Sequence, residues 1–400
     1  MDIKKTVSGM IDESGGLLRL EPALVSRVFL PPGKRLGLPD KDYDVGPRGY
    51  ITERWIASTT EAENPIVTKD EGLSFLDVSG VLGASPITLR DAVEAAPDLI
   101  MGADYASTHK GLGRLPKFFD NDNRLPFHIH QTQRDASKLG KKSKEESYYF
   151  PPNVPMGPHP ETFFGLHPYI VREGRKDLIV QYLEDWEHTD RFLSLSRAYL
   201  NMPDDGFHLP AGILHAPGSA LTIELQEDSD VSAMFQGRLA LRLLDKGVLT
   251  RDVPPDELKE KGMMALVDQL DWEANGDPYF YENHHTPPLP IEGKIGPDSE
   301  EWWIFYNTNK YSGTKLIVRP GKSCECFDKG AYNILVWDGE GEFGGLPVRG
   351  RSLTRDEIMV TDARAKRGVK VVNTGKEDMM IIKFFGPDIN GDAPVLKKYA

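Results

Sequence analysis

Two histidines one residue apart, in the stretch "RLPFHIHQTQ", are the residues of this chain that most clearly suggest chemistry. In an extended strand, residues i and i+2 share a face, so the imidazoles of His128 and His130 point to the same side. Neutral imidazoles are good ligands for Zn²⁺, Fe²⁺ and Mn²⁺. The spacing therefore predicts two ligands of one metal ion, although an H-x-H pair alone also occurs on exposed strands that bind no metal.

A carboxylate and a third histidine would complete a mixed ligand set. Glu146 begins the apolar run "ESYYF", and His215 follows the turn in "FHLPAGILHAPGSALTIEL". Three imidazoles and one carboxylate suit a divalent first-row ion. We predict a single site formed by His128, His130, Glu146 and His215, with Zn²⁺ as the first expectation and Mn, Fe, Co or Ni as alternatives.

The segments that must position these residues are mostly short strands. Thirty prolines and 38 glycines separate apolar runs such as "ALTIEL", "TKLIVR", "YNILVW" and "MMIIKFF", a pattern typical of strands joined by turns. Helical periodicity is confined to "TLRDAVEAA" after a Thr88/Asp91 capping box, to residues 175–200 and to residues 254–270. Residues 271–299 are rich in Pro, Gly and Asn and are predicted to be a linker or a segment that crosses between domains.

Length and charge exclude several classes of protein. A chain of 400 residues is too long for one core and predicts at least two domains. A formal charge of −13 argues against a general binder of nucleic acid or anionic membranes. The chain has no apolar run of membrane-spanning length, and the segment at its start lacks the apolar core of a secretion signal. With only two cysteines, Cys324 and Cys326, it is expected to be a cytoplasmic protein.

Three motifs in order carry a family resemblance: "RLPKFFDNDNRLPFHIHQTQRDASKLG", "GKKSKEESYYF" and "FHLPAGILHAPGSALTIELQEDSD". They resemble the type I mannose-6-phosphate isomerases of the cupin superfamily, and the upstream "ITERWIAS" resembles a glutamate-x-tryptophan element of those enzymes. The resemblance covers residues 45–235. It implies a mainly β fold with two cupin (double-stranded β-helix or jelly-roll) domains: residues 1–250 with the metal and a helical insertion at about 170–200, a crossing segment at 251–299, and a second, metal-free cupin at 300–400.

The resemblance also implies roles for individual residues. His128 stands where the family usually has a glutamine ligand, whereas His130, Glu146 and His215 keep the family's ligands. Lys144 matches the active-site lysine, and Glu224 matches a glutamate that assists proton transfer. Glu53, Trp55 and Arg238 are expected to bind the substrate. One departure is clear: the family's catalytic arginine, five positions after Ser229, is Met234 here.

The activity implied is a metal-dependent aldose–ketose isomerisation, in which a proton moves between neighbouring carbons through a cis-enediol. The expected substrate is a sugar or sugar phosphate, and Met234 favours a different or unphosphorylated sugar. Two alternatives remain open. One is a non-catalytic sugar-binding or regulatory protein with two cupin domains, and the other is an iron-dependent cupin oxygenase.

The second β block lacks the ligands of the first. Cys324 and Cys326 fall on one face where an H-x-H pair would lie, but neither a histidine nor a glutamate follows at the required places. We interpret both as reduced structural cysteines. This block is expected to serve packing or the formation of a homodimer.

Overall fold

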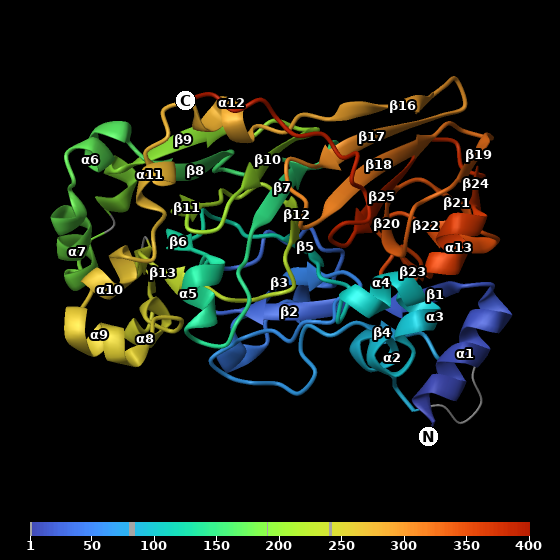
Figure 1. Ribbon diagram of the computed structural model, residues 1–400, viewed down its shortest axis with the longest axis horizontal. Coiled ribbons are helices and arrows are strands. Elements are labelled where there is room, and N and C mark those ends of the chain that lie inside the picture. Colours follow the sequence, from blue (N-terminus) through green and yellow to red (C-terminus); the bar gives the residue numbers. More distant parts are fainter. Residues whose placement is uncertain (1, 80–84, 190, 240–241) are drawn as a thin grey trace.

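The apolar runs predicted as strands are strands in the computed structural model, which describes residues 2–79, 85–189, 191–239 and 242–400. The four runs quoted above fall in β12 (Thr222–Gln226), β18 (Ser312–Val318), β20 (Tyr332–Asp338) and β25 (Met379–Phe385). Strands account for 31% of the chain and helices for 23%, which confirms the mainly β prediction. The strands form two barrels that lie side by side (Figure 1).

The first barrel consists of two antiparallel sheets that face each other. Aromatic side chains fill one part of its interior; Phe164 contacts Phe207 across the two sheets with ring centroids 5.2 Å apart. One sheet has the order β10 (Asp205–Leu209), β7 (Glu146–Phe150), β12, β5 (Leu115–Phe119), β3 (Tyr50–Trp55) and β2 (Ala23–Arg27). The other has the order β13 (Ala233–Met234), β6 (His128–Ile129), β11 (His215–Ala216), β8 (Glu161–Leu166) and β9 (Ser196–Leu200).

The second barrel encloses an apolar core that includes Val336, Ile358 and Ile381. Its larger sheet has the order β16 (Leu289–Ile295), β17 (Ser299–Phe305), β18, β25, β20, β23 (Glu357–Val360), β1 (Leu17–Glu21) and β4 (Phe75–Leu76). Its smaller sheet has the order β19 (Ser323–Cys326), β24 (Val369–Asn373), β21 (Glu340–Phe343) and β22 (Leu346–Arg349). Because β1 pairs with β23, a segment near the start of the chain completes a sheet built mainly from residues after 288.

The two barrels pack through the outer faces of their larger sheets. Phe118 and Ile223 of the first barrel belong to the same buried cluster as Phe305 and Ile382 of the second. Along β3 successive side chains alternate, so Glu53 and Trp55 lie on one face of the strand and Arg54 on the other. The buried Arg54 guanidinium lies 2.7 Å from Asp356 and 2.9 Å from Glu357 of the second barrel. A continuous apolar layer and the buried Arg54 ion cluster therefore join the barrels.

Helices cover the outer face of the β6/β11 sheet. They contribute Ile179, Leu183 and Leu266 to a cluster with Ile129 and Leu214 of that sheet. These helices are α6 (Pro168–Arg172), α7 (Lys176–Glu184), η3 (Arg191–Ser194), α8 (Lys246–Leu249), α9 (Pro255–Lys261) and α10 (Met264–Val267). Helix α5 (Gln133–Ser137) precedes β7, and β14 (Arg238–Leu239) pairs with β15 (Arg242–Leu243).

Two sequence predictions differ from the structure. The helix predicted over 175–200 ends at Glu184, where the Asp185 amide closes the last turn on the Gln181 carbonyl, and further along "SRAYL" pairs with β8 as β9; residue 190 of the predicted helix lies outside the described residues. The predicted linker at 271–299 contains α11 (Trp272–Asn275), α12 (Phe280–His284) and β16. Local composition pointed to a linker, but packing of Phe280 in the core of the first barrel stabilises α12.

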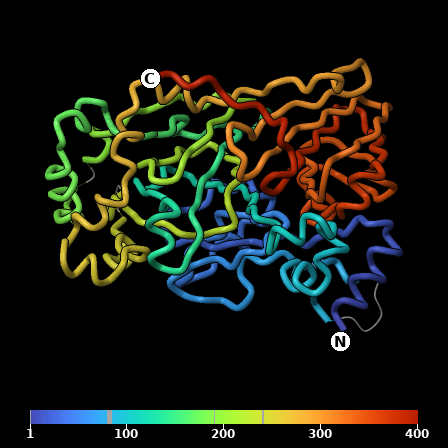
Figure 2. The backbone as a smooth tube through the Cα atoms, viewed as in Figure 1, coloured from blue at the N-terminus to red at the C-terminus, as the bar shows by residue number. Residues whose placement is uncertain are grey.

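In Figure 1, α1 (Ile3–Ser14) lies at the lower right of the molecule, whereas the C-terminus lies on the upper edge, left of centre. Near the start, α1, α2 (Leu89–Ala95), α3 (Pro97–Met101) and α4 (Ala103–Thr108) surround β1 and β4, and α13 (Asp362–Arg367) lies beside them. Thr88 caps α2 as predicted, accepting a 3.0 Å hydrogen bond from the Asp91 amide. The final segment runs from the second barrel back to α12, where the Tyr399 amide donates to Asn283 (Figure 2).

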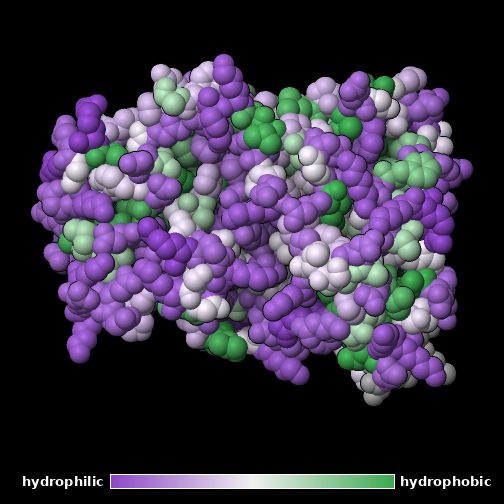
Figure 3. All heavy atoms as spheres, in the orientation of Figure 1, coloured by the Kyte–Doolittle hydropathy of each residue, from purple (hydrophilic) through white to green (hydrophobic). Residues whose placement is uncertain are grey.

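The surface seen in Figure 3 is mostly hydrophilic, and its apolar residues occur in small, separate groups. The short helices η1 (Asp40–Asp42) and η2 (Gly46–Arg48) lie in the loop before β3. Within the described residues, no helix has both the length and the apolar character needed to cross a bilayer.

Candidate metal centre

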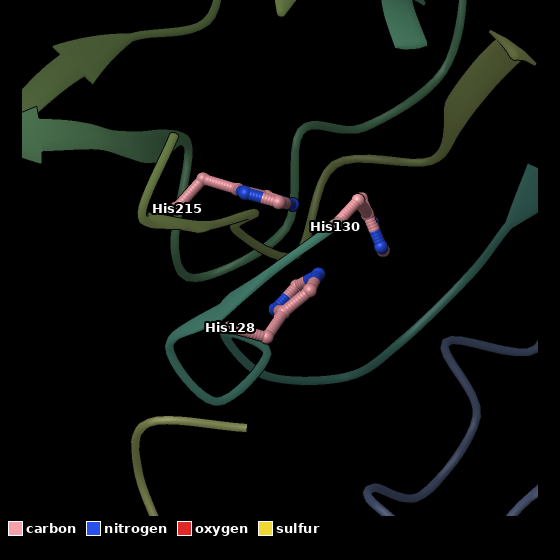
Figure 4. Close-up of side chains that lie close together, drawn as sticks. All are labelled: His128, His130 and His215. Atoms are coloured by element: carbon pink, nitrogen blue, oxygen red, sulfur yellow. The ribbon is translucent and has the colours of Figure 1, made fainter. Parts of the chain in front are cut away.

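Three histidines at the neighbouring strands β6 and β11 meet inside the first barrel. His128 is in β6 directly opposite His215 of β11, and His130 follows β6. Ring nitrogens of the three side chains lie within 4.8 Å of one another, and the imidazoles converge on one region (Figure 4). All three side chains are buried. Because residues i and i+2 share one face, His128 and His130 both lie beside His215, as the sequence predicted.

Hydrogen bonds to the backbone fix the same tautomer in each ring. The Nδ1 atoms of His128, His130 and His215 each lie 2.8 Å from a carbonyl oxygen, those of Pro126, Val231 and Ile213. A carbonyl only accepts, so Nδ1 carries the hydrogen and Nε2 keeps its lone pair. Burial, with the neighbouring imidazoles, lowers the pKa of His128 well below its ordinary value. Burial and Lys144 lower the pKa of His130 to about 3, so both rings are neutral.

Glu146 adds a carboxylate to these nitrogens from the facing sheet. It is the first residue of β7; its Oε1 lies 3.2 Å from His215 Nε2, and its Oε2 lies 3.1 Å from His130 Nε2. An ionised carboxylate and an Nε2 lone pair are both acceptors, so each contact is favourable only with a cation beside it. Lys144 lies at the His130 contact, 3.1 Å from Glu146 Oε2, whereas His215 Nε2 is buried without a hydrogen-bond partner. These four residues therefore fit a divalent metal ion.

Lys144 and Glu224 lie directly against this group. The Lys144 ammonium donates to His130 Nε2 at 2.9 Å and lies 3.1 Å from Glu146 and 3.3 Å from Glu224. Burial and the nearby Glu146 charge raise the pKa of Glu224 to about 8, against the opposing effect of Lys117 and Lys144. Burial also acts to raise the pKa of Glu146, but the Lys144 ammonium outweighs it and keeps that pKa well below its usual range. The site thus holds two neighbouring carboxyl groups with opposite pKa shifts, a pattern suited to acid–base chemistry.

Sequence reasoning missed the charged wall next to these residues. The Arg27 guanidinium lies 2.8 Å from Glu53 and 3.0 Å from Asp230, and Lys117 lies 3.6 Å from Glu53 and 3.5 Å from Glu224. Burial would raise the pKa of Glu53, but Arg27 and Lys117 outweigh it and lower that pKa to about 2. A signal was present: Lys117 in "LPKFF" and Arg27 at the end of "ALVSR" are charged residues inside apolar strands.

The cavity beside the histidines is small, about 60 Å³. Its charged lining consists of Arg27, Lys117, Lys144, Arg251, Glu53, Glu146, Glu224 and Asp230. Its aromatic and apolar lining consists of Phe29, Phe119, Leu125, Tyr148, Pro217 and Met234. Tyr148, which sequence reasoning also missed, donates its hydroxyl hydrogen to Glu146.

Two residues predicted to bind substrate lie outside this lining. Trp55 is buried behind it, and its Nε1 donates to Glu53 at 2.7 Å, so it positions that carboxylate. Arg238 lies on the surface and donates to the Glu187 carbonyl at 3.1 Å. Sequence proximity to Met234 suggested a pocket residue, but the chain has left the barrel by that point. Glu53, by contrast, lines the cavity as predicted.

The second barrel differs from the first in its interior groups. Among the described residues, three possible metal ligands lie close together in one group, formed by His128, His130 and His215. None of the three is in the second barrel. Cys324 and Cys326 lie there as free thiols.

Comparison with known proteins shows a likeness of fold. No protein-family model matches the chain, and no curated protein sequence does. Among solved structures, mannose 6-phosphate isomerase from Bacillus subtilis superposes with a TM-score of 0.61 at 14% identity, over 92% of this chain and 99% of that one. A variant of phosphomannose isomerase from Salmonella typhimurium superposes with a TM-score of 0.62 at 12% identity, over 93% of this chain and 100% of that one. The likeness spans nearly the whole of each chain, and this protein therefore has the fold of the mannose-6-phosphate isomerases.

Proposed function

We propose that this protein is a metal-dependent aldose–ketose isomerase with its active site at His128, His130, Glu146 and His215. The observation that carries the proposal is the set of three imidazoles whose Nδ1 atoms are bound to carbonyls, so that their Nε2 lone pairs meet the Glu146 carboxylate. The isomerase fold of the solved neighbours supports the choice of reaction class.

The residues around the ligands have the chemistry that this reaction requires. A bound divalent ion, for which we propose Zn²⁺, would act as a Lewis acid toward the two sugar oxygens at the reacting carbons. Lys144, 3.1 Å from Glu146, places a positive charge where the enediolate oxygens gain negative charge. Glu224, on the other side of Lys144, is placed to exchange a proton with the neighbouring carbons. Tyr148 orients the Glu146 carboxylate.

The proposal is tested by elemental analysis and by NMR in D₂O with a panel of aldoses. We expect about one equivalent of metal, and aldose–ketose interconversion in which solvent deuterium enters the carbon next to the carbonyl. His215→Ala should lose both the metal and the activity. His285→Ala, which removes a histidine paired with Asp205 on the same barrel, is the matched control and should keep both. Protein without metal after reconstitution, or with metal but inert toward every aldose and ketose, would contradict the proposal.

One observation favours a second candidate, a sugar-binding protein without catalysis. Met234 lines the cavity where the resemblance leads one to expect an arginine, and Arg238 lies on the surface. Such a protein would bind a sugar in calorimetry and exchange no carbon-bound proton with solvent. The free thiols Cys324 and Cys326 support a reducing, cytoplasmic location for either activity.

A further inference from the structure

We propose that the substrate is a neutral, unphosphorylated sugar, because the cations of the cavity are already paired with carboxylates. The inference rests on the proposed function in locating the reacting end of the sugar at the histidines. It concerns the charge of the ligand, and the binding of neutral and charged ligands can be measured separately from turnover.

Each inner cation of the cavity lies between two carboxyl groups of the protein. Arg27 pairs with Glu53 at 2.8 Å and with Asp230 at 3.0 Å. Lys117 lies between Glu53 and Glu224 at 3.6 and 3.5 Å, and Lys144 lies between Glu146 and Glu224 at 3.1 and 3.3 Å. Each of these side chains is almost completely buried.

Arg251 is the remaining cation of the cavity lining, and its donors are also used. Its Nη2 atom donates to the Asp230 carbonyl and to Ser232 Oγ, both at 2.7 Å. Its Nη1 atom donates to the Glu63 carbonyl at 2.9 Å, and its Nε atom donates to Asp252 at 3.1 Å. Four of its five N–H groups are therefore bound within the protein.

At the rim of this network, Lys141 is paired in the same way. Its ammonium lies 2.5 Å from Glu63 and 2.7 Å from Asp252. Arg and Lys donors that are free to turn toward its oxygens give a phosphate its strongest side-chain contacts. A phosphate beside Arg251 and Lys141 would have to displace carboxylates from these cations or lie beside those carboxylates as a like charge, and both carry an electrostatic cost.

The size and the remaining lining of the cavity agree with this reading. A cavity of about 60 Å³ is far below the 300–1,000 Å³ typical of sites that enclose a whole ligand, so it admits only the reacting end of a sugar. The far end of the sugar would lie at the rim, beside Arg251 and Lys141, which share Asp252. Phe29, Phe119, Leu125 and Pro217 supply apolar surface that suits the C–H groups of a neutral sugar.

The test compares matched ligands on the Co²⁺-substituted protein, whose visible spectrum reports a ligand that reaches the metal. D-mannose, D-fructose and a pentose pair are titrated against mannose 6-phosphate and fructose 6-phosphate, and turnover of each is measured in parallel. We expect neutral sugars to change the spectrum and to have kcat/KM values at least 100-fold above those of the phosphates.

The outcomes separate the inference from the proposed function. Neutral sugars that change the spectrum without turnover would support the inference and count against the isomerase. Preferential binding or turnover of the phosphates would overturn the inference while leaving the isomerase intact. A spectrum that no neutral sugar in the panel changes would also overturn the inference.

A charge-releasing variant tests the physical cause. Glu63→Gln removes a carboxylate that pairs with Lys141, and we expect the affinity for the 6-phosphates to rise about 10-fold while that for neutral sugars stays unchanged. The matched control is Glu61→Gln, which breaks a pair with Arg90 on the surface and should change neither affinity. Equal phosphate affinity in the wild type and in Glu63→Gln would show that pairing of the cations does not exclude phosphate.

Discussion

At the scale of single residues, the candidate metal ligands differ in how each is held. His128 and His215 face each other across the β6/β11 pair, and each donates its Nδ1 hydrogen to a carbonyl two residues earlier in the chain. His130 donates to Val231, which is distant in sequence. The orientation of His128 and His215 is thus set by their own strands, and that of His130 by tertiary packing.

Replacing single ligands should therefore have unequal effects. In His128→Gln the amide oxygen is able to take over a ligand position, and we expect metal affinity to fall by about 10-fold or less. His215→Ala leaves no donor, and we expect a loss of 100-fold or more. Competition with a chromophoric chelator measures both affinities. Equal losses in the two variants would show that the Gln side chain does not reach the metal.

The pairing of Glu53 with Arg27 and Lys117 makes the stability of the fold depend on pH. The pKa of Glu53 is lowered from 4.5 to about 2, so its pairing with Arg27 and Lys117 stabilises the fold above pH 4.5, and this stability is lost as the pH falls toward 2. The full contribution is on the order of 3 kcal/mol. In Glu53→Gln we expect the free energy of unfolding to depend less steeply on pH between 4.5 and 2, as measured by urea denaturation. Glu21→Gln, on the surface, is the control; an unchanged slope in Glu53→Gln would contradict the assignment.

At this scale the sequence was informative about ligands and poor about their surroundings. Spacing alone placed His128 beside His130, and the order of the motifs added Glu146 and His215. The pairing of Arg27 with Asp230 joins residues about 200 positions apart, which no local pattern encodes. Trp55 and Arg238 were assigned to the pocket by position in the chain, whereas the direction of each side chain was decided by the sheet and by the end of the barrel.

At the scale of elements, the turn before β11 connects two of the ligands. Gly212 has φ of 85°; its amide donates to the His130 carbonyl at 2.8 Å, and its own carbonyl accepts from the Asp271 amide at 3.0 Å. A Cβ at this position would lie 3.1 Å from Asp271 and from Thr132. This turn therefore sets the position of His215 relative to His130.

Gly212→Ala should weaken metal binding as well as the fold. A positive φ costs an L-residue about 1–2 kcal/mol, and the crowding moves the turn further. We expect a lower melting temperature and about 10-fold weaker metal affinity, measured by calorimetry with the reconstituted metal. Gly262→Ala is the matched control, because Gly262 has φ of 59° and nothing within 4 Å of its Cβ position. It should lower the melting temperature alone; a loss of affinity in this control would make the effect unspecific.

Strand and cap predictions succeeded where the signal was local. The apolar runs and the Thr88 cap depend on residues within a few positions of each other, and both are present in the structure. The run after Glu184 and the segment 271–299 were misread because tertiary contacts decide them: β9 forms by pairing with β8, and α12 by burial of Phe280.

At the scale of the whole molecule, Arg54 is a buried charge that joins the barrels. Its side chain is about 2% exposed and is bound to Asp356 and Glu357. Removal of one partner from a buried ion cluster leaves the others uncompensated, at a cost of about 3–5 kcal/mol. We expect Arg54→Met to lower the free energy of unfolding by that amount in urea denaturation. Arg90→Met, which removes a surface pair with Glu61, should change it by less than about 0.5 kcal/mol. If Arg54→Met changed the free energy of unfolding as little as Arg90→Met does, the cluster would not stabilise the packing of the barrels.

The two-barrel organisation could be predicted from the rhythm of strands and turns, but the membership of the second barrel could not. The pairing of Leu17 with Val360 joins residues about 340 positions apart and leaves no trace in the composition around either residue. The division at 1–250, 251–299 and 300–400 remains a prediction, to which the structure adds that β1 and β4 lie in the sheet of the second barrel.

The position of β1 has a consequence for biosynthesis. This strand is synthesised about 340 residues before its partner β23. Its apolar residues Leu17 and Leu18 must therefore wait, unpaired on that edge, until β23 has been made. The second barrel closes only after that point, and nascent chains that stall before residue 357 expose an open strand edge to other chains and to chaperones.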